Sequence, residues 1–222
     1  MSIKENLNKI QQELSEKVTL VAVSKTKPNE DIFEAYNAGQ RIFGENKVQE
    51  MTSKWEALPK DIEWHMIGHV QRNKVKYMAP FVSLIHGVDT LKLLKEIEKQ
   101  AKKNDRVIPC LLQMHIAKEE TKFGMDEDEL REVLTSEAFQ QMEHVKVVGL
   151  MGMATFTDDE ERVKGEFEYL KNLYDTIKSD YPKTERLDVN ILSMGMSGDY
   201  KLAMECGSTM VRIGSSIFGA RN

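Results

Sequence analysis

The hydrophobic and polar positions of the chain alternate between two patterns. Short apolar runs rich in β-branched residues recur along the sequence, and each is followed by a longer stretch with the apolar spacing of an amphipathic helix. The runs predict strands at 18–24, 41–46, 62–68, 82–88, 107–116, 145–153, 187–195 and 208–219. The stretches between them predict helices at 28–38, 47–58, 70–79, 89–103, 125–139, 158–179 and 197–207, and a charged amphipathic helix at 1–17 precedes the first strand.

Eight predicted strands that alternate with helices indicate the α/β class and a parallel sheet. This number favours a closed (β/α)₈ TIM barrel over an open doubly wound sheet, which would call for a glycine-rich turn after its first strand. The turn at 24–28 reads SKTKP and contains no glycine. Because no linker, low-complexity tract or internal repeat interrupts the rhythm, we expect a single barrel domain over 1–222 with an extra N-terminal helix.

Charge and cysteine content narrow the function classes. The chain has 31 Lys+Arg and 36 Asp+Glu, a formal net charge of −5 without any basic block, which argues against nucleic acid or an anionic membrane as partner. Cys110 and Cys206 form no C-x-x-C pair, as is typical of the reducing cytoplasm. No run approaches the roughly 20 apolar residues of a membrane span, and the N-terminal segment lacks the apolar core of a signal peptide. We expect a cytoplasmic protein that is monomeric, since its helix faces are charged.

The lysine at position 25 lies at the carboxyl end of the first predicted strand, just before Pro28 begins a helix. An isolated lysine there would ordinarily be a solvated side chain. In a TIM barrel, however, the carboxyl ends of all strands meet at one mouth, where active sites lie. Other polar residues at predicted strand ends are Glu45, Asn46, His65, His86, Lys118 or Lys122, Ser193, Ser197, Arg212 and Ser215.

The last strand carries the second informative pattern. Arg212 falls inside an apolar run, where a charged group needs a partner. Gly214, Ser215 and Ser216 follow it, and small residues let backbone N–H groups approach an anion. Alone, this pattern is equally typical of a glycine turn beside a surface-paired arginine. The loops after the seventh and eighth strands are nevertheless where TIM barrels most often bind phosphate.

A strand-end lysine opposite a phosphate site predicts pyridoxal 5′-phosphate (PLP), an aldehyde that condenses with a lysine amine while its phosphate is held elsewhere. A metal site is not predicted. His65 and His69 have the i, i+4 spacing of helical metal ligands, but Gly68 lies between them and the segment is predicted to run from strand into turn.

Seven motifs resemble the pyridoxal phosphate homeostasis protein family, whose barrel is similar to the amino-terminal domain of bacterial alanine racemase, the type III PLP-binding fold. They run from about 18 to 221: AVSKTKP at 22–28, FGEN at 43–46, WHMIGHVQRNK at 64–74, K-x-G at 122–124, GLMGM at 149–153, LSMGMSGD at 192–199 and GSTMVRIGSSIFGAR at 207–221. Their specificity comes from their combination and order.

The resemblance implies a role for each cofactor-binding candidate. Lys25 would form a Schiff base with PLP, Asn46 would lie beside the ring or its 3-hydroxyl, and His65 would lie near the ring. The phosphate would be bound by Ser193, Ser197, Gly214 and Ser215. Arg212 would donate to the pyridine nitrogen and, because it cannot accept a proton, would leave that nitrogen largely unprotonated and the cofactor a weak electron sink. One departure is Gly87, where the family often has serine or threonine.

Three function classes stay open at this point. The favoured class is a non-catalytic PLP carrier or buffer, with apo forms of PLP-dependent enzymes as candidate recipients. A racemase-like enzyme would need a second base facing Lys25; the sequence offers Tyr77, Tyr174 and Tyr200 without placing them, and we expect no second β-rich domain. The third class is a barrel that binds another phosphate ester, with Lys25 as an electrostatic contact.

Overall fold

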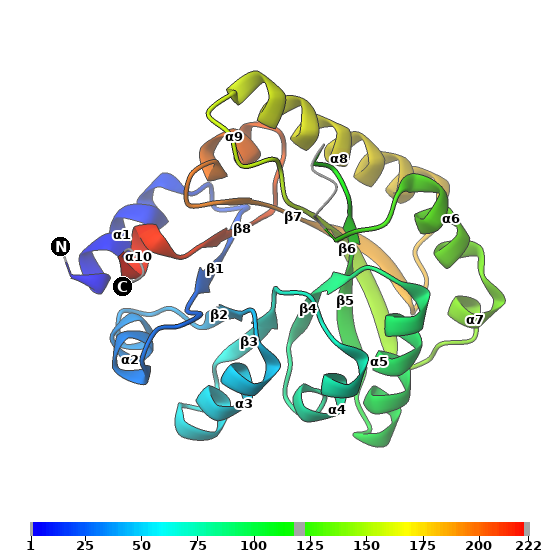
Figure 1. The fold of residues 1–222 in the computed structure, drawn as a ribbon, viewed down its shortest axis with the longest axis horizontal. Coiled ribbons are helices and arrows are strands. Elements are labelled where there is room, and N and C mark those ends of the chain that lie inside the picture. The colour runs from blue at the N-terminus through cyan, green and yellow to red at the C-terminus, as the bar shows by residue number, and fades with distance from the viewer. Residues whose placement is uncertain (1, 118–122, 220–222) are drawn as a thin grey trace.

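Eight parallel strands close into one barrel in sequence order, with β8 pairing with β1. The computed structural model describes residues 2–117 and 123–219. The strands are β1 (Thr19–Val23), β2 (Ile42–Glu45), β3 (Glu63–Met66), β4 (Leu84–Val88), β5 (Ile108–Met114), β6 (Val145–Gly152), β7 (Leu187–Met196) and β8 (Met210–Ile213). Each lies within or overlaps a predicted run, and helices surround the barrel (Figure 1). The predicted (β/α)₈ fold is confirmed.

The helices follow the predicted stretches, with two differences, and in addition a short helix at 215–218 replaces the end of the strand predicted at 208–219. They are α1 (Ile3–Glu13), α2 (Asn29–Asn37), α3 (Val48–Ala57), η1 (Arg72–Lys74), α4 (Val75–Met78), α5 (Leu91–Lys103), α6 (Glu127–Thr135), α7 (Glu137–Gln140), α8 (Glu160–Asp180), α9 (Tyr200–Glu205) and α10 (Ser215–Phe218). The stretch 125–139 breaks at Ser136, whose extended backbone ends α6 and whose side chain caps α7. The stretch 70–79 shrinks to one 3₁₀ turn and the short α4, because η1 has no buried residue to anchor a longer helix.

The N-terminal helix α1 packs beside α10 at the edge of the barrel (Figure 1). Ser2 and Glu5 form a capping box at its start, and Leu7 and Ile10 are buried along one face. The Asn6 Nδ2 donates to the carbonyl oxygen of Ile217 at 3.0 Å. Helix α1 therefore supports the element that follows β8, which borders the mouth of the barrel.

The barrel has two separate groups of buried apolar side chains. The larger group lies between strands and helices and includes Trp64, Phe43 and Phe167. A smaller group, which includes Val21, Leu111 and Met151, is separate from it. Because successive strand residues point to opposite faces, the smaller group fills the barrel interior. Among the described residues, no helix combines the length and apolar character needed to cross a membrane.

Candidate cofactor site

A cavity of about 710 Å³ opens at the carboxyl ends of the strands. It lies where the fold predicts a ligand site. Six of the eight predicted binding residues line it: Lys25, Asn46, Ser197, Arg212, Gly214 and Ser215. The structure therefore brings together residues from the ends of β1, β2, β7 and β8 around one space, whereas Ser193 and His65 do not border it.

Arg212, on β8, is 3% exposed and hydrogen-bonded across the barrel. Its Nη1 donates to Ser193 Oγ at 2.5 Å, and its Nη2 donates to the carbonyl oxygen of Gly152 at 3.1 Å. Both acceptors are neutral, so these bonds hold the guanidinium without cancelling its charge. Burial lowers the pKa of Arg212 to about 10, which still leaves the side chain positively charged at neutral pH.

Beneath Arg212, two buried histidines extend the same chain of polar contacts. Ser193 Oγ lies 3.0 Å from His86 Nδ1, and His86 Nε2 lies 3.0 Å from His65 Nδ1. Burial lowers the pKa of His65 to about 3, and burial together with His65 and Arg212 lowers the pKa of His86 well below its usual range. Both imidazoles are therefore neutral at neutral pH, and each has one donor and one acceptor nitrogen for this chain.

The position of Ser193 gives it a different environment from the one the resemblance implies. Its side chain is fully buried, and its hydroxyl contacts Arg212 and His86 below the cavity. His65 is likewise buried below the cavity. Ser193 therefore contacts Arg212 directly, and His65 is connected to it through His86 and Ser193. The wall expected to bind phosphate contains Ser197, Gly214 and Ser215.

That wall joins the loops after β7 and β8. The Gly214 N–H donates to Ser197 Oγ at 3.1 Å, which connects the two loops directly. Ser215 begins α10, whose first N–H groups have no acceptor within the helix. A side chain at position 214 would meet the carbonyl oxygen of Val23 at 3.1 Å, so glycine allows β8 to pass close to β1. Hydroxyl and amide donors of this kind suit a phosphate.

The opposite wall depends on two glycines at strand ends. A Cβ at Gly68 would lie 2.5 Å from the carbonyl oxygen of Asn46, and a Cβ at Gly87 would lie 2.6 Å from the carbonyl oxygen of Gly68. The ends of β2, β3 and β4 can approach this closely only because both positions lack a side chain. The structure thus explains glycine at 87, and it identifies Gly68 as a residue that sequence reasoning missed.

Aromatic and titratable residues form the rim of the cavity. The ring of Phe123 stacks on His69 with centroids 4.0 Å apart, and His69 Nδ1 lies 3.0 Å from Asp89 Oδ2. Phe156, after β6, is 94% exposed. Sequence reasoning considered His69 only as a metal ligand and did not single out Phe123, Phe156 or Asp89. The one signal for the two aromatic residues was their position in loops that follow strands.

The remaining candidates are two lysines and three tyrosines. Lys118 and Lys122 fall outside the described residues. Tyr77, Tyr174 and Tyr200 do not line the cavity, and the Tyr200 hydroxyl donates to Glu13. Over residues 2–117 and 123–219, no group of three or more histidine, cysteine, aspartate or glutamate side chains is arranged to hold a metal ion.

The donor set of the cavity fits PLP. A lysine amine suits an aldehyde, and the hydroxyl and amide donors of Ser197 and Ser215 suit a phosphate. A buried arginine whose protein acceptors are neutral suits an electron-rich ring nitrogen. The three groups belong to β1, the wall near α10 and β8, so one small ligand in the cavity can meet all of them.

A family model, sequence relatives and solved structures all identify the same family. The sequence matches the family described as "Alanine racemase, N-terminal domain" over residues 1–222. A pyridoxal phosphate homeostasis protein of Aquifex aeolicus is 42% identical over 203 residues, which cover 91% of this chain and 86% of the relative.

Solved structures agree with the sequence relatives. PipY of Synechococcus elongatus, solved without PLP, is 34% identical, with a TM-score of 0.92 over 98% of this chain and 100% of the PipY chain. PipY with PLP bound has a TM-score of 0.88 over the same shares of the two chains. An alanine racemase of Clostridium difficile is 16% identical, with a TM-score of 0.79 over 99% of this chain and 60% of the racemase, which shows a shared fold. The chain therefore belongs to the alanine racemase N-terminal domain family and, within it, to the pyridoxal phosphate homeostasis proteins.

Proposed function

We propose that this protein binds PLP in the cavity at the barrel mouth and serves PLP homeostasis as a carrier or buffer of the cofactor. The observation that carries the proposal is the placement of Lys25 and the donors Arg212 and Ser215 around one cavity. PLP supplies an aldehyde that condenses reversibly with an amine and releases water. The relatives named as pyridoxal phosphate homeostasis proteins, and PipY with PLP bound, support this function.

Each proposed contact follows from the position of a residue. Lys25 binds the aldehyde covalently, and Asn46, on the neighbouring wall, donates to the 3-hydroxyl or contacts the ring. Arg212 donates to the pyridine nitrogen, and Ser193, His86 and His65 keep its guanidinium in place from below. The phosphate is bound by Ser197, Gly214 and Ser215.

We further propose that the protein does not turn over amino acids. The relatives are named as homeostasis proteins and not as enzymes. Racemisation requires a base on each face of the substrate, and no tyrosine lines the described part of the cavity. With a pKa of about 10, Arg212 keeps its own proton and only donates a hydrogen bond, so the ring nitrogen would stay largely unprotonated and the carbanion chemistry that PLP supports would be restrained.

We propose a single-domain, monomeric, cytoplasmic protein that supplies PLP to apo-enzymes. The buried free thiols Cys110 and Cys206 suit a reducing compartment. The net charge of −5, spread over the helices, favours solubility as a monomer. Size-exclusion chromatography with light scattering tests the monomer, and reactivation of an apo-enzyme by the PLP-loaded protein tests the transfer.

The central test is the chemistry of Lys25. The purified protein should take up PLP with a visible absorbance band, and borohydride should fix the cofactor to Lys25 in peptide mass spectrometry. A Lys25→Ala variant should remain colourless. An adduct on Lys27 or another lysine, with Lys25 unmodified, would remove the proposal.

A further inference from the structure

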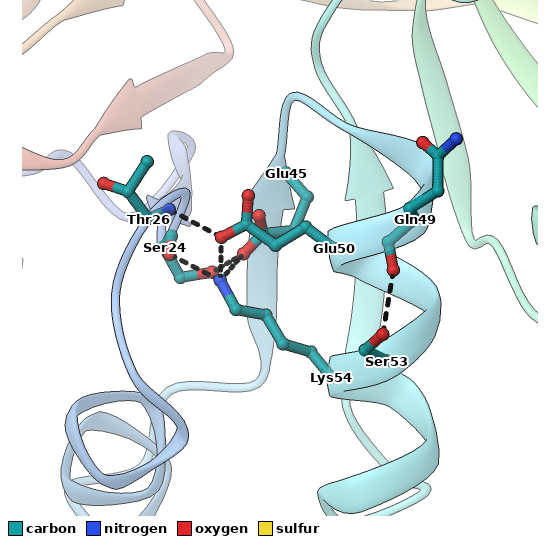
Figure 2. A network of polar contacts seen from close by, with 7 residues as sticks. All are labelled: Ser24, Thr26, Glu45, Gln49, Glu50, Ser53 and Lys54. Carbon is teal, nitrogen blue, oxygen red and sulfur yellow. Dashed lines mark hydrogen bonds and ion pairs between the residues drawn. The ribbon is translucent and has the colours of Figure 1, made fainter.

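A buried network of charges lies directly beneath the turn that carries Lys25 (Figure 2). Lys54, on α3, reaches inward and its Nζ donates to Glu45 Oε1 at 2.8 Å and to Glu50 Oε1 at 2.7 Å. Ser24 Oγ also donates to Glu45 Oε1, at 2.6 Å. Sequence reasoning missed this network, because Glu50 and Lys54 have the i, i+4 spacing of an ordinary surface pair on a helix.

Burying the charged side chains of this network costs free energy. Glu45 is 0% exposed and Lys54 is 5% exposed. Burial raises the pKa of Glu45 although Lys54 and Ser24 oppose the shift, and Glu45 Oε2 accepts no hydrogen bond from any residue that the structure describes. A buried ion pair seldom stabilises a fold more than well-packed apolar side chains would. A purely structural role therefore gives a weak reason for a buried ammonium at this position.

The contacts of the network point to the turn as the part it serves. Lys54 Nζ donates to the carbonyl oxygen of Ser24 at 2.8 Å, and the Thr26 N–H donates to Glu50 Oε1 at 2.6 Å. These two contacts hold the residues immediately before and after Lys25. On the far side of the turn, Lys27 Nζ donates to the carbonyl oxygen of Phe218 at 2.9 Å.

The conformation of the turn explains why it needs such contacts. Thr26 has φ of 64°, in the left-handed region that is rare and unfavourable for a β-branched residue. Strain of this kind persists only where surrounding contacts impose it. The hydrogen bond from Thr26 to Glu50 is one such contact, and the pKa of Glu50 is lowered because bonds from Lys54 and the Thr26 N–H outweigh its burial.

We infer that Glu50 and Lys54 are positioning residues that set the reactivity of Lys25. The inference rests on the proposed PLP-binding function. A fixed turn confines the Lys25 amine to a small volume at the cavity, so the amine reaches a bound aldehyde without a large loss of freedom. When the turn relaxes, the covalent step slows. The wall that would hold the phosphate contains Ser197, Gly214 and Ser215, and Glu50 makes its hydrogen bonds to Thr26 and Lys54 instead.

The variants separate positioning from folding. Glu50 is part-exposed, so Glu50→Ala removes the Thr26 acceptor without leaving a large buried void. Glu50→Gln keeps an amide oxygen for the Thr26 N–H and is the conservative rescue. Ser53→Ala is the matched control, because Ser53 is on the same helix, donates to the carbonyl oxygen of Gln49 at 3.1 Å and lies away from the turn (Figure 2).

The experiment uses the full chain freed of cofactor and measures how it reacts with or binds two ligands. One is PLP, followed by absorbance and by borohydride trapping on Lys25; the other is pyridoxine 5′-phosphate, which has an alcohol in place of the aldehyde and forms no covalent bond. Glu50→Ala should slow the covalent step by about tenfold or more, because the amine loses its fixed orientation. Its affinity for pyridoxine 5′-phosphate should change by less than about twofold, since the walls are intact. Glu50→Gln should recover most of the rate, and Ser53→Ala should match the parent.

The outcomes are distinguishable. Trapping at the parental rate in Glu50→Ala would overturn the inference alone. So would an equal loss of affinity for both ligands, or a Glu50→Ala chain that is unfolded at the assay temperature, since either shows a general structural role. A parent that forms no adduct on Lys25 would overturn the proposed function and this inference together.

Discussion

Replacing Arg212 by methionine is expected to weaken PLP binding strongly while leaving the unliganded protein about as stable as before. Arg212 is buried among neutral partners, Ser193 Oγ and the carbonyl oxygen of Gly152. Methionine has a similar length, no charge and a side chain that adapts to its surroundings. The substitution therefore removes the cation without opening a large void.

Two opposing effects set the stability of the variant. Burial lowers the pKa of Arg212 from its ordinary value to about 10. At about 1.4 kcal/mol per pKa unit, the charge costs the fold about 3 kcal/mol. Because the folded-state pKa is the lower one, this cost is fully present below pH 10 and declines as the pH rises toward the unfolded value. Methionine removes that cost but loses two charge-assisted hydrogen bonds, each about 1.5–3 kcal/mol. The unfolding free energy should therefore fall by about 0–3 kcal/mol.

For PLP binding, no gain in free energy offsets the loss of the arginine. Loss of one charge-assisted hydrogen bond to the ring nitrogen should cost about 1.5–3 kcal/mol, a tenfold to hundredfold loss of affinity. Urea unfolding at pH 7.5 without ligand gives the stability, and titration with PLP gives the affinity. Arg212→Lys is the control, because it keeps the buried charge without the forked donor and should be less stable than the methionine variant. Unchanged PLP affinity in Arg212→Met, or a loss of stability above about 4 kcal/mol, would refute this reasoning.

Four further outcomes are expected. Because the pKa of His65 is lowered to about 3, the folded protein should lose stability as the pH falls from 6.5, by up to about 1.4 kcal/mol per pH unit. The imidazole NMR signals of His65 should not titrate between pH 5 and 8. Ser215→Ala should lower PLP affinity by roughly tenfold with an unchanged melting temperature, measured by titration and calorimetry. Gly68→Ala, which forces Cβ against the carbonyl oxygen of Asn46, should lower both stability and PLP affinity, in contrast to Gly165→Ala, whose Cβ has no neighbour within 4 Å. Chiral chromatography should find no racemisation of common amino acids, and turnover near about 1 s⁻¹ would favour an enzyme instead.

The fold and the location of the site were predictable because both depend on local pattern. Apolar runs set the strands, and the barrel topology then brings Lys25 and Arg212 to one mouth whatever the details between them. The two serines near the end of β7 show where this reasoning stops. The pairing of β7 with β8 shifts register between Ser193 and Met196. A one-residue shift reverses the direction of a strand side chain, so Ser193 points to Arg212 below the cavity, whereas Ser197 lines it.

Tertiary distances account for the features that the sequence did not predict. The role of Gly68 depends on how closely the ends of β2 and β3 approach, and the sequence contains no measure of that distance. Lys54 points inward because α3 packs with that face against β2, a choice that an i, i+4 pair of opposite charges does not indicate. The helix predicted at 70–79 is shorter in the structure for a related reason. Residues 71–74 provide no buried apolar side chain that would hold a full helix against the barrel.

The contact between Lys27 and the carbonyl oxygen of Phe218 joins an early segment of the chain to a late one. During synthesis on the ribosome, the Lys25 turn emerges long before β8 and α10 exist, and β1 lacks one of its two partner strands until then. Contacts of such long sequence separation form late in folding. The cavity at the barrel mouth is therefore complete only once β8 and α10 have folded against the Lys25 turn, because Arg212 and Ser215 form part of its lining.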